Sequence, residues 1–265
     1  MARVYPICSS SDGNCTFIGT RGHGILVDAG CSFRALKSAL ELIDTPLSGI
    51  EAVFVTHEHI DHVRGIAQLM KHTNIPVFAS GGTISQMMED VKNPLPEGAK
   101  LFNIFTDGYR SAEFFVSAFH TPHDTPESCG YTIDYAGHRF AVCTDIGYVT
   151  DEIEYNLTGC DCVLLEANYD PEMLRRNPRY SAFLKQRIES NHGHLSNPDA
   201  AEFCERLVRS GTRHIILGHL SRENNTPAIA HAAISSHLAK TGLKTERDYT
   251  LNVAPIHTDG NFIAV

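Results

Sequence analysis

The chain has 265 residues, of which 42% are hydrophobic and 20% are charged, as is typical of a globular protein with a substantial core. Its formal net charge of −9 excludes a broadly basic surface for nucleic acid but leaves room for a local basic patch. No run of about 20 apolar residues predicts a membrane span, and the amino-terminal segment lacks the apolar region of a signal peptide, so we expect a cytoplasmic protein. The eight cysteines show no CxxC pair or zinc-finger spacing and are expected to be buried reduced thiols.

Apolar runs and turn residues predict alternating strands and helices in the first half of the chain. After a first strand, the expected elements are a turn at 8–14, a strand at 24–28, a helix capped by Ser32, a strand at 52–55, a helix from about His62, a strand at 76–79 and a helix at 82–91.

The second half predicts the same alternation, with the clearest helical periodicity at 198–209. Asn197 is expected to cap that helix, with Pro198 at its first position. The other expected elements are strands near 101–105, 114–119, 129–135 and 138–144, a hairpin turn at Ala136-Gly137, strands at 161–167 and 214–218, a helix near 226–240, and strands near 248–253 and 261–265. This pattern predicts one layered α/β domain over residues 1–265.

The segment His57-Glu58-His59-Ile60-Asp61-His62 carries four metal-ligand side chains at the end of an apolar run. In an extended segment residues two apart point the same way, so His57 and His59 can bind one ion together. Asp61 and His62 follow where the chain turns towards a helix and can reach a second ion. The alternative, a histidine-rich surface turn, is much less probable for this spacing.

Two divalent ions need about seven or eight protein ligands, so further ligands must come from elsewhere in the chain. His123, Asp145 and His219 each follow a β-type run, where a loop can direct a side chain into a common site. Each is weak evidence alone, because a histidine at a strand end is more often an ordinary surface residue. Together with the first motif they indicate a two-metal centre.

This pattern resembles the metallo-β-lactamase superfamily, which implies a four-layer αββα sandwich and a dinuclear site. By this resemblance His57, His59 and His123 hold one ion, Asp61, His62 and His219 hold the other, and Asp145 bridges the two. Asp28 and Asp124 are expected to orient ligand imidazoles. The implied cofactor is a pair of divalent ions, manganese, zinc or iron, with a bridging hydroxide.

Asp61 and His59 also exclude two branches of the superfamily from this resemblance. The β-lactam hydrolases that bind zinc through cysteine lack this arrangement, and flavodiiron oxidoreductases place Glu at the position of His59. The complete motif is similar to the phosphodiesterase, nuclease and glyoxalase II branches. The catalytic residues expected from it are Asp61, Asp145 and His194, where His194 resembles a proton-donating histidine of related phosphodiesterases and His192 is the alternative.

Several strings resemble one branch, the YycJ (WalJ) family. They are Ser9-Ser-Ser-Asp-Gly-Asn14, Cys143-Thr-Asp-Ile-Gly-Tyr148, Glu166-Ala-Asn-Tyr-Asp170, Gly193-His-Leu-Ser-Asn197 and His219-Leu-Ser-Arg-Glu-Asn-Asn225. The resemblance implies a 5′-to-3′ exonuclease that acts on double-stranded DNA and is linked to mismatch repair. The sequence between Asp145 and His219 is too short for the inserted domain of β-CASP nucleases. His120, upstream of His123, is the alternative ligand, and the interval from His123 to Gly130-Tyr131 favours His123.

The densest basic stretch lies in that interval and could bind phosphates of the DNA substrate, although a solvated helix face is equally consistent with it. Its residues are Arg175, Arg176, Arg179, Lys185 and Arg187. Three other functions remain open: a small-molecule phosphodiesterase, a thioester hydrolase of the glyoxalase II type, and a metal-binding partner protein without catalysis. The oligomeric state is left open.

Overall fold

The computed structural model of the chain describes residues 1–258 and 260–265. The fold divides into two compact units. Unit 1 comprises Met1–Ala118, Thr125–Cys129 and Pro255–Val265, and unit 2 comprises Phe119–Asp124 and Gly130–Ala254. The single domain without a β-CASP insertion stays a prediction. In the described part of the chain, no helix has the length and apolar character needed to cross a membrane.

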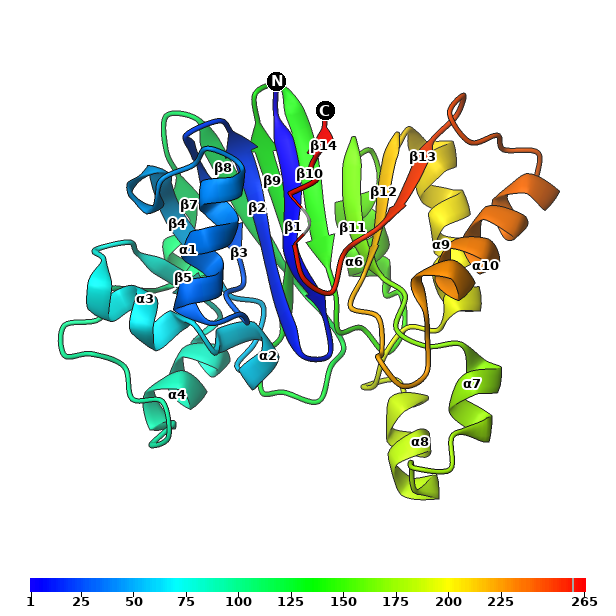
Figure 1. Cartoon of the computed structure of the whole chain (residues 1–265), viewed down its shortest axis with the longest axis horizontal. Coiled ribbons are helices and arrows are strands. Elements are labelled where there is room, and N and C mark those ends of the chain that lie inside the picture. Colours follow the sequence, from blue (N-terminus) through cyan, green and yellow to red (C-terminus); the bar gives the residue numbers. More distant parts are fainter. Residues whose placement is uncertain (259) are drawn as a thin grey trace. The chain divides into compact units, whose positions relative to one another are not determined.

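Unit 1 is built on a sheet whose described strands follow the order β14-β1-β2-β3-β4-β5-β6 (Figure 1). The strands are β1 (Arg3–Ser10), β2 (Gly13–Thr20), β3 (His23–Val27), β4 (Ile50–Phe54), β5 (Val77–Ala79), β6 (Leu101–Asn103) and β14 (Ile263–Ala264). β1, β2 and β3 are antiparallel neighbours, whereas β3, β4, β5 and β6 run parallel. The carboxyl ends of β3 and β4 therefore meet at one edge of the sheet.

Helices of unit 1 pack on this sheet and bury its core. They are α1 (Phe33–Leu42), the 3-10 helix η1 (Leu47–Gly49), α2 (Ile60–Val63), α3 (Ile66–His72), α4 (Gly81–Glu89) and α5 (Ile104–Asp107). Leu36, Ala39 and Leu40 of α1 are buried in one cluster with Leu26 and Val53 of the strands. A hairpin of β7 (Tyr109–Arg110) and β8 (Phe114–His120) follows, and the boundary between the units falls within β8, after Ala118.

Unit 2 has a second, largely parallel set of strands. These are β9 (Cys129–Tyr135), β10 (His138–Cys143), β11 (Cys162–Glu166), β12 (His214–Gly218) and β13 (Thr250–Val253). β9 and β10 form an antiparallel hairpin, and β10, β11, β12 and β13 run parallel in that order. Almost every residue of β11 and β12 is buried, which explains their continuous apolar sequence.

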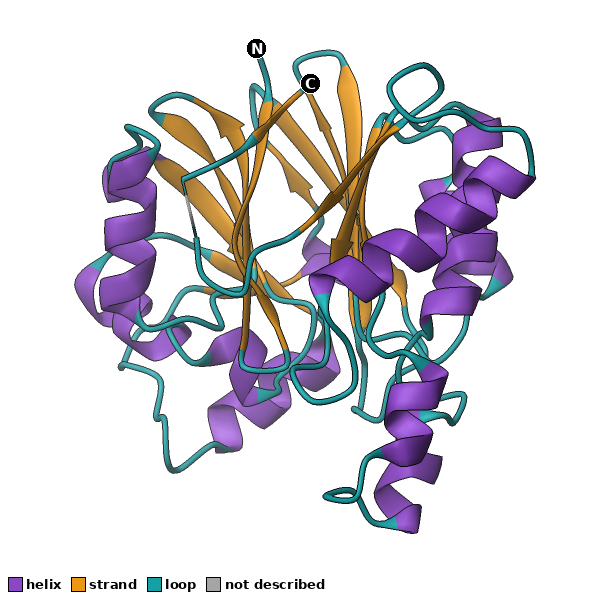
Figure 2. Ribbon diagram, turned by 45° about the vertical axis from the view of Figure 1, so that its right-hand side comes forward, coloured by secondary structure: helices purple, strands orange, loops and turns teal. Residues whose placement is uncertain are grey.

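The helices of unit 2 are α6 (Asp151–Leu157), α7 (Pro171–Arg176), α8 (Ala182–Ile188), α9 (Asn197–Ser210) and α10 (Pro227–Lys240). α9 and α10 lie beside one another next to β12 and β13, whereas α7 and α8 extend beyond the strand ends (Figures 1 and 2). Phe203, Leu207 and Ile234 pack with β-strand residues such as Ile215 in one buried cluster.

Most predicted elements are confirmed, with shifts at their ends that have local causes. Ser196, rather than Asn197, caps α9 by accepting a hydrogen bond from Asp199 N, so the helix begins one residue earlier than expected. β1 and β2 extend into the expected turn at 8–14, because Cys8 and Cys15 pair across the strands. The strand expected at 101–105 ends at Asn103, whose side chain accepts from Phe105 N and starts α5.

Candidate metal centre

The predicted ligand loop of unit 1 brings three imidazoles together. It follows β4, and Asp61 and His62 lie in α2. The ring centroids of His57 and His59 are 4.6 Å apart, and those of His57 and His62 are 4.1 Å apart. The six-residue motif thus forms a compact histidine cluster, as its spacing predicts.

Asp28, at the end of β3, holds this loop from the neighbouring strand. His62 Nδ1 lies 2.8 Å from Asp28 Oδ2, and the backbone N–H of Thr56 donates to Asp28 Oδ1 at 2.8 Å. Since Nδ1 of His62 faces a carboxylate, Nε2 is left as the nitrogen with a lone pair for a metal ion. The geometry matches the supporting role expected for Asp28.

Two residues that sequence reasoning did not single out also support the loop. The amide of Asn14 lies 3.3 Å from Asp61 Oδ2 and 3.1 Å from His62 Nε2. Gly30 approaches so closely that a Cβ there would lie 1.6 Å from the carbonyl oxygen of Asp61. Asn14 is the last residue of Ser9-Ser-Ser-Asp-Gly-Asn14, one of the segments that resemble the YycJ (WalJ) family. Its place in that segment is the sequence signal that could have identified it.

In unit 2, possible metal-binding side chains lie at the carboxyl ends of three adjacent parallel strands. Asp145 follows β10, Glu166 ends β11 and His219 follows β12. Asp145 and His219 have φ values of 57° and 52°, and Asp28 of unit 1 has a φ of 62°. Left-handed backbone is costly for a non-glycine residue and is typical of functional sites whose surroundings enforce it.

Glu166 is the central acceptor of this cluster, and its role was not predicted. Its Oε1 lies 2.8 Å from His194 Nδ1 and 3.0 Å from His219 Nδ1, and its Oε2 accepts from Ile146 N at 2.7 Å. Ligand atoms of Asp145, Glu166, His194 and His219 all lie within 4.8 Å of one another. The sequence signal that could have indicated this role is an acidic residue, Glu166, at the end of an apolar strand.

His123 joins the same cluster. Its Nδ1 lies 3.1 Å from the carbonyl oxygen of Gly193, and its Nε2 lies 3.7 Å from Asp145 Oδ1 and 3.3 Å from Asp124 Oδ1. The side chain of His123 is 2% exposed, whereas that of His120 is 54% exposed. His123 is therefore the better placed of the two candidate ligands.

The pKa shifts reflect burial and local charge. Burial raises the pKa of Asp28, against the opposing effects of His62 and Thr56. Burial also lowers the pKa of His123, which favours the neutral imidazole that metal coordination requires. At Glu166 burial acts to raise the pKa, but the charge and hydrogen bonds of His194, with the hydrogen bond of His219, lower it overall.

The donor atoms of each unit fit divalent metal ions. His62 of unit 1, and His123 and His219 of unit 2, each have Nδ1 beside an acceptor oxygen, which leaves Nε2 as the coordinating nitrogen. Asp61 in unit 1 and Asp145 in unit 2 add hard oxygen ligands, and such mixed sets suit zinc, manganese or iron.

The charge of the predicted basic patch around α7 and α8 is partly offset by ion pairs. Arg175 and Arg176 pair with Glu172, Arg179 pairs with Glu223, and Arg187 pairs with Asp124. The ion pair with Arg187 engages the carboxylate of Asp124, which also lies near His123. A phosphate would have to compete with these carboxylates, so the binding role of the patch stays a prediction.

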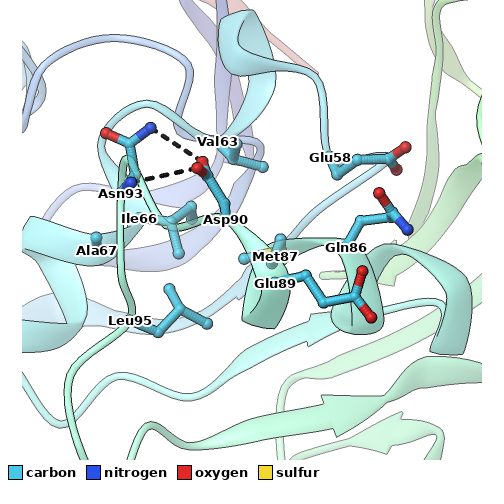
Figure 3. Close-up of a pocket in the computed structure, with 10 residues that line it drawn as sticks. All are labelled: Glu58, Val63, Ile66, Ala67, Gln86, Met87, Glu89, Asp90, Asn93 and Leu95. Carbon is cyan, nitrogen blue, oxygen red and sulfur yellow. Dashed lines mark hydrogen bonds between the residues drawn. The ribbon is translucent and has the colours of Figure 1, made fainter.

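A cavity of about 360 Å³ in unit 1 adjoins the ligand loop (Figure 3). Glu58, Glu89 and Asp90 contribute carboxylates, and Ile66 and Met87 are among its apolar lining. Asp90 is hydrogen-bonded to Asn93. The three carboxylates make the cavity unfavourable for phosphate, so a nucleic-acid backbone is not expected to occupy it.

Comparisons with known proteins show which family this chain resembles. A family model described as a beta-lactamase superfamily domain matches residues 23–220. The exodeoxyribonuclease YycJ of Bacillus anthracis is 33% identical over 236 residues, which are 89% of each chain. The exodeoxyribonuclease WalJ of Streptococcus pneumoniae serotype 2 is 34% identical over 245 residues, which are 92% of this chain and 90% of the relative.

A solved structure, the metallo-beta-lactamase fold protein YhfI from Bacillus subtilis, has a TM-score of 0.69 to this chain. It is 17% identical and covers 97% of this chain and 98% of its own. The similarity confirms the fold class expected from the sequence, an αββα sandwich of the metallo-β-lactamase type.

Proposed function

The chain belongs to the metallo-β-lactamase superfamily and, within it, to the YycJ/WalJ family, and from this premise we propose that it is a metal-dependent exonuclease that acts on DNA. The fold and the relatives indicate a metal-dependent hydrolase. The observation that carries the DNA substrate is the identity to two exodeoxyribonucleases over about nine-tenths of both chains. Digestion of duplex DNA from its 5′ ends, a link to mismatch repair, and a cytoplasmic location belong to the proposal.

The proposed ligands of two divalent ions are those given by the sequence: His57, His59, Asp61, His62, His123, Asp145 and His219. Such ions, when bound, supply a water-derived nucleophile of lowered pKa and positive charge beside the phosphate oxygens. The support is the orientation of the imidazoles, since Asp28, Glu166 and the Gly193 carbonyl hold the Nδ1 atoms of three of them.

We assign to His194 the role of proton donor in bond cleavage. Glu166 holds its Nδ1 at 2.8 Å, and its side chain is 23% exposed. Its Nε2 can therefore carry a proton for the departing 3′ oxygen of the DNA strand. His192 is exposed, which makes His194 the better candidate for this role.

The proposal is tested with duplex DNA labelled at either end, bis-p-nitrophenyl phosphate and an acyl-glutathione, each with added manganese or zinc. We expect shortening of the duplex from its 5′ ends, and loss of this activity in His59→Ala. Hydrolysis of the small diester alone would favour a small-molecule phosphodiesterase, and thioester cleavage would favour the glyoxalase type. Bound metal without any turnover would favour a binding protein.

A matched pair of variants separates the bridging ligand from the proton donor. Asp145→Ala should lose both metal and activity, whereas His194→Ala should keep the metal and lose DNA cleavage. Full activity and normal metal content in Asp145→Ala would refute the assignment of this ligand.

A further inference from the structure

Three cysteines of unit 1 form a cluster, Cys8, Cys15 and Cys31, that the proposed nuclease chemistry does not use. Cys8 and Cys15 face one another as partners of the antiparallel pair β1 and β2. The backbone N–H of Gly30 donates to Asn14 O at 2.7 Å, which fixes Cys31 beside Cys15. Cys31 packs against the buried cluster of side chains that contains Cys8 and Cys15. We call these three residues the thiol cluster.

The surroundings of Cys31 favour a reactive thiolate. It is partly exposed, whereas Cys8 and Cys15 are buried. It directly precedes Ser32, the N-cap of α1, and so lies at the positive end of a ten-residue helix. Hydrogen bonds from Cys15 and Cys8, and the nearby Arg64, lower the pKa of Cys31. A partly exposed thiol in an electropositive setting is the type that oxidants attack.

The thiol cluster is joined to the metal-ligand loop at two points. Cys15 follows Asn14, whose amide lies beside Asp61 and His62. Cys31 ends the segment in which Asp28 contacts His62 and the N–H of Ala29 donates to His62 O at 2.9 Å. A covalent change that moves Cys15 or Cys31 therefore acts on the residues that hold Asp61 and His62.

We propose that the thiol cluster is an oxidation site, at which a hydroperoxide converts Cys31 and Cys15 into a disulfide. In the first step the Cys31 sulfur attacks one peroxide oxygen, the O–O bond breaks, and the products from hydrogen peroxide are a sulfenic acid and water. In the second step the Cys15 sulfur attacks the Cys31 sulfur, the S–O bond breaks, and a second water leaves with the Cys15 proton. The two thiols are oxidised by two electrons, which the peroxide accepts.

The disulfide draws Cys15 and Cys31 into the geometry that an S–S bond requires, with Cβ atoms about 3.8 Å apart. Asn14 and the segment Asp28–Gly30 move with them. Oxidation therefore loosens the support of Asp61 and His62 and weakens the retention of metal. Reduction of the disulfide by a dithiol restores the original loop.

The test treats the purified, metal-loaded protein with hydrogen peroxide and maps disulfides by mass spectrometry of peptides from the unreduced chain. We expect a Cys31–Cys15 disulfide in the wild type, partial release of metal on oxidation, and recovery after reduction and addition of metal. Cys31→Ser should block the disulfide and retain its metal under peroxide. The double variant Cys8→Ser/Cys15→Ser, which removes both neighbouring thiols, should stop at a sulfenic acid on Cys31, detectable with a dimedone probe.

Cys160→Ser, which alters a buried thiol of unit 2, is the matched control and should behave as the wild type. Circular dichroism checks that each variant is folded, and disulfide mapping of the wild type requires no variant. Oxidation of Cys31 only to a sulfinic acid, or no modification at Cys31 under conditions that oxidise exposed methionines, would overturn the proposal. Both readouts are independent of DNA cleavage, so they are informative even if the nuclease assignment fails.

Discussion

At the scale of single residues, the site depends on acceptors behind the predicted ligands as much as on the ligands. Asp28 in unit 1 and Glu166 in unit 2 are buried carboxylates at strand ends, and each lies beside Nδ1 of a predicted ligand histidine. Such contacts fix the tautomer and the orientation of the imidazole. Glu166 contacts two imidazoles at once, which makes it the more sensitive of the two positions.

Glu166→Gln is expected to lower metal affinity by roughly 10- to 100-fold, the usual effect of removing a residue that orients a ligand. An amide cannot accept from both imidazoles while also accepting the backbone N–H of Ile146. Metal titration of the apoprotein followed by elemental analysis measures the change. Glu205→Gln, on the surface of the same unit, is the control, and an affinity equal to the control would contradict the role given to Glu166.

Gly30→Ala should disrupt the ligand loop, because the added methyl group would lie 1.6 Å from the carbonyl oxygen of Asp61. Backbone must move to relieve such a contact, so we expect loss of metal and destabilisation by about 1–3 kcal/mol. Gly81→Ala is the matched control, since its methyl group would meet the side-chain ends of Asn103 at 3.0 Å and of Glu127 at 3.6 Å, and no backbone atom is among these nearest neighbours. Urea denaturation and metal content report the two effects, and a Gly30→Ala protein that matches its control on both would show that the loop accommodates the methyl group.

At the scale of elements, parallel strands explain why residues distant in sequence gather at one edge. β10, β11 and β12 are paired in register, so Asp145, Glu166 and His219 emerge at neighbouring positions. α9 packs against these strands through Phe203 and Leu207, and begins three residues after His194. The stability of α9 therefore contributes to the placement of His194.

Ser196→Ala should destabilise the protein by about 1 kcal/mol, because Ser196 caps α9 through Asp199 N. Chemical denaturation measures the difference in the free energy of unfolding. Ser85→Ala, an exposed serine of α4, is the control and is expected to change it by less than about 0.5 kcal/mol. Equal effects of the two substitutions would mean that the cap does not stabilise the helix.

At the scale of the whole molecule, the net charge of −9 opposes the approach of a phosphate backbone. Two acidic side chains, Asp61 and Asp145, belong to the predicted ligand set, so bound divalent ions would offset part of the negative charge. The metals are therefore expected to matter for stability as well as for catalysis.

Removal of metal by a chelator should lower the melting temperature, because a ligand that binds only the folded state stabilises it by mass action. At a free metal concentration one hundred times the Kd this stabilisation is about 2.7 kcal/mol. Differential scanning calorimetry with and without chelator, followed by addition of manganese or zinc, measures the shift. An unchanged melting temperature in protein shown to have lost its metal would be inconsistent with a structural contribution of the ions.

The sequence by itself determined the ligand types, most elements and the family. The spacing of His57, His59, Asp61 and His62 is local, and local spacing can be read because residues two or three apart have a fixed relation in a strand or helix. The alternation of strand-like and helix-like segments likewise predicted the layered α/β fold, because each segment's pattern of apolar residues is local. The exact ends differed where a side chain such as Ser196 or Asn103 captured a backbone N–H.

Only the tertiary structure identified residues beyond Asp28 and Asp124 that support the ligands. Asn14, Glu166 and the thiol cluster act through contacts between strands and loops far apart in sequence, and no periodicity records such pairs. The structure also showed that the basic residues of α7 and α8 are paired with acids, because the position of Glu223 and Asp124 beside them depends on chain folding. The ligand residues could therefore be predicted from local sequence spacing, whereas the residues that hold them in place could be found only from contacts between distant parts of the chain.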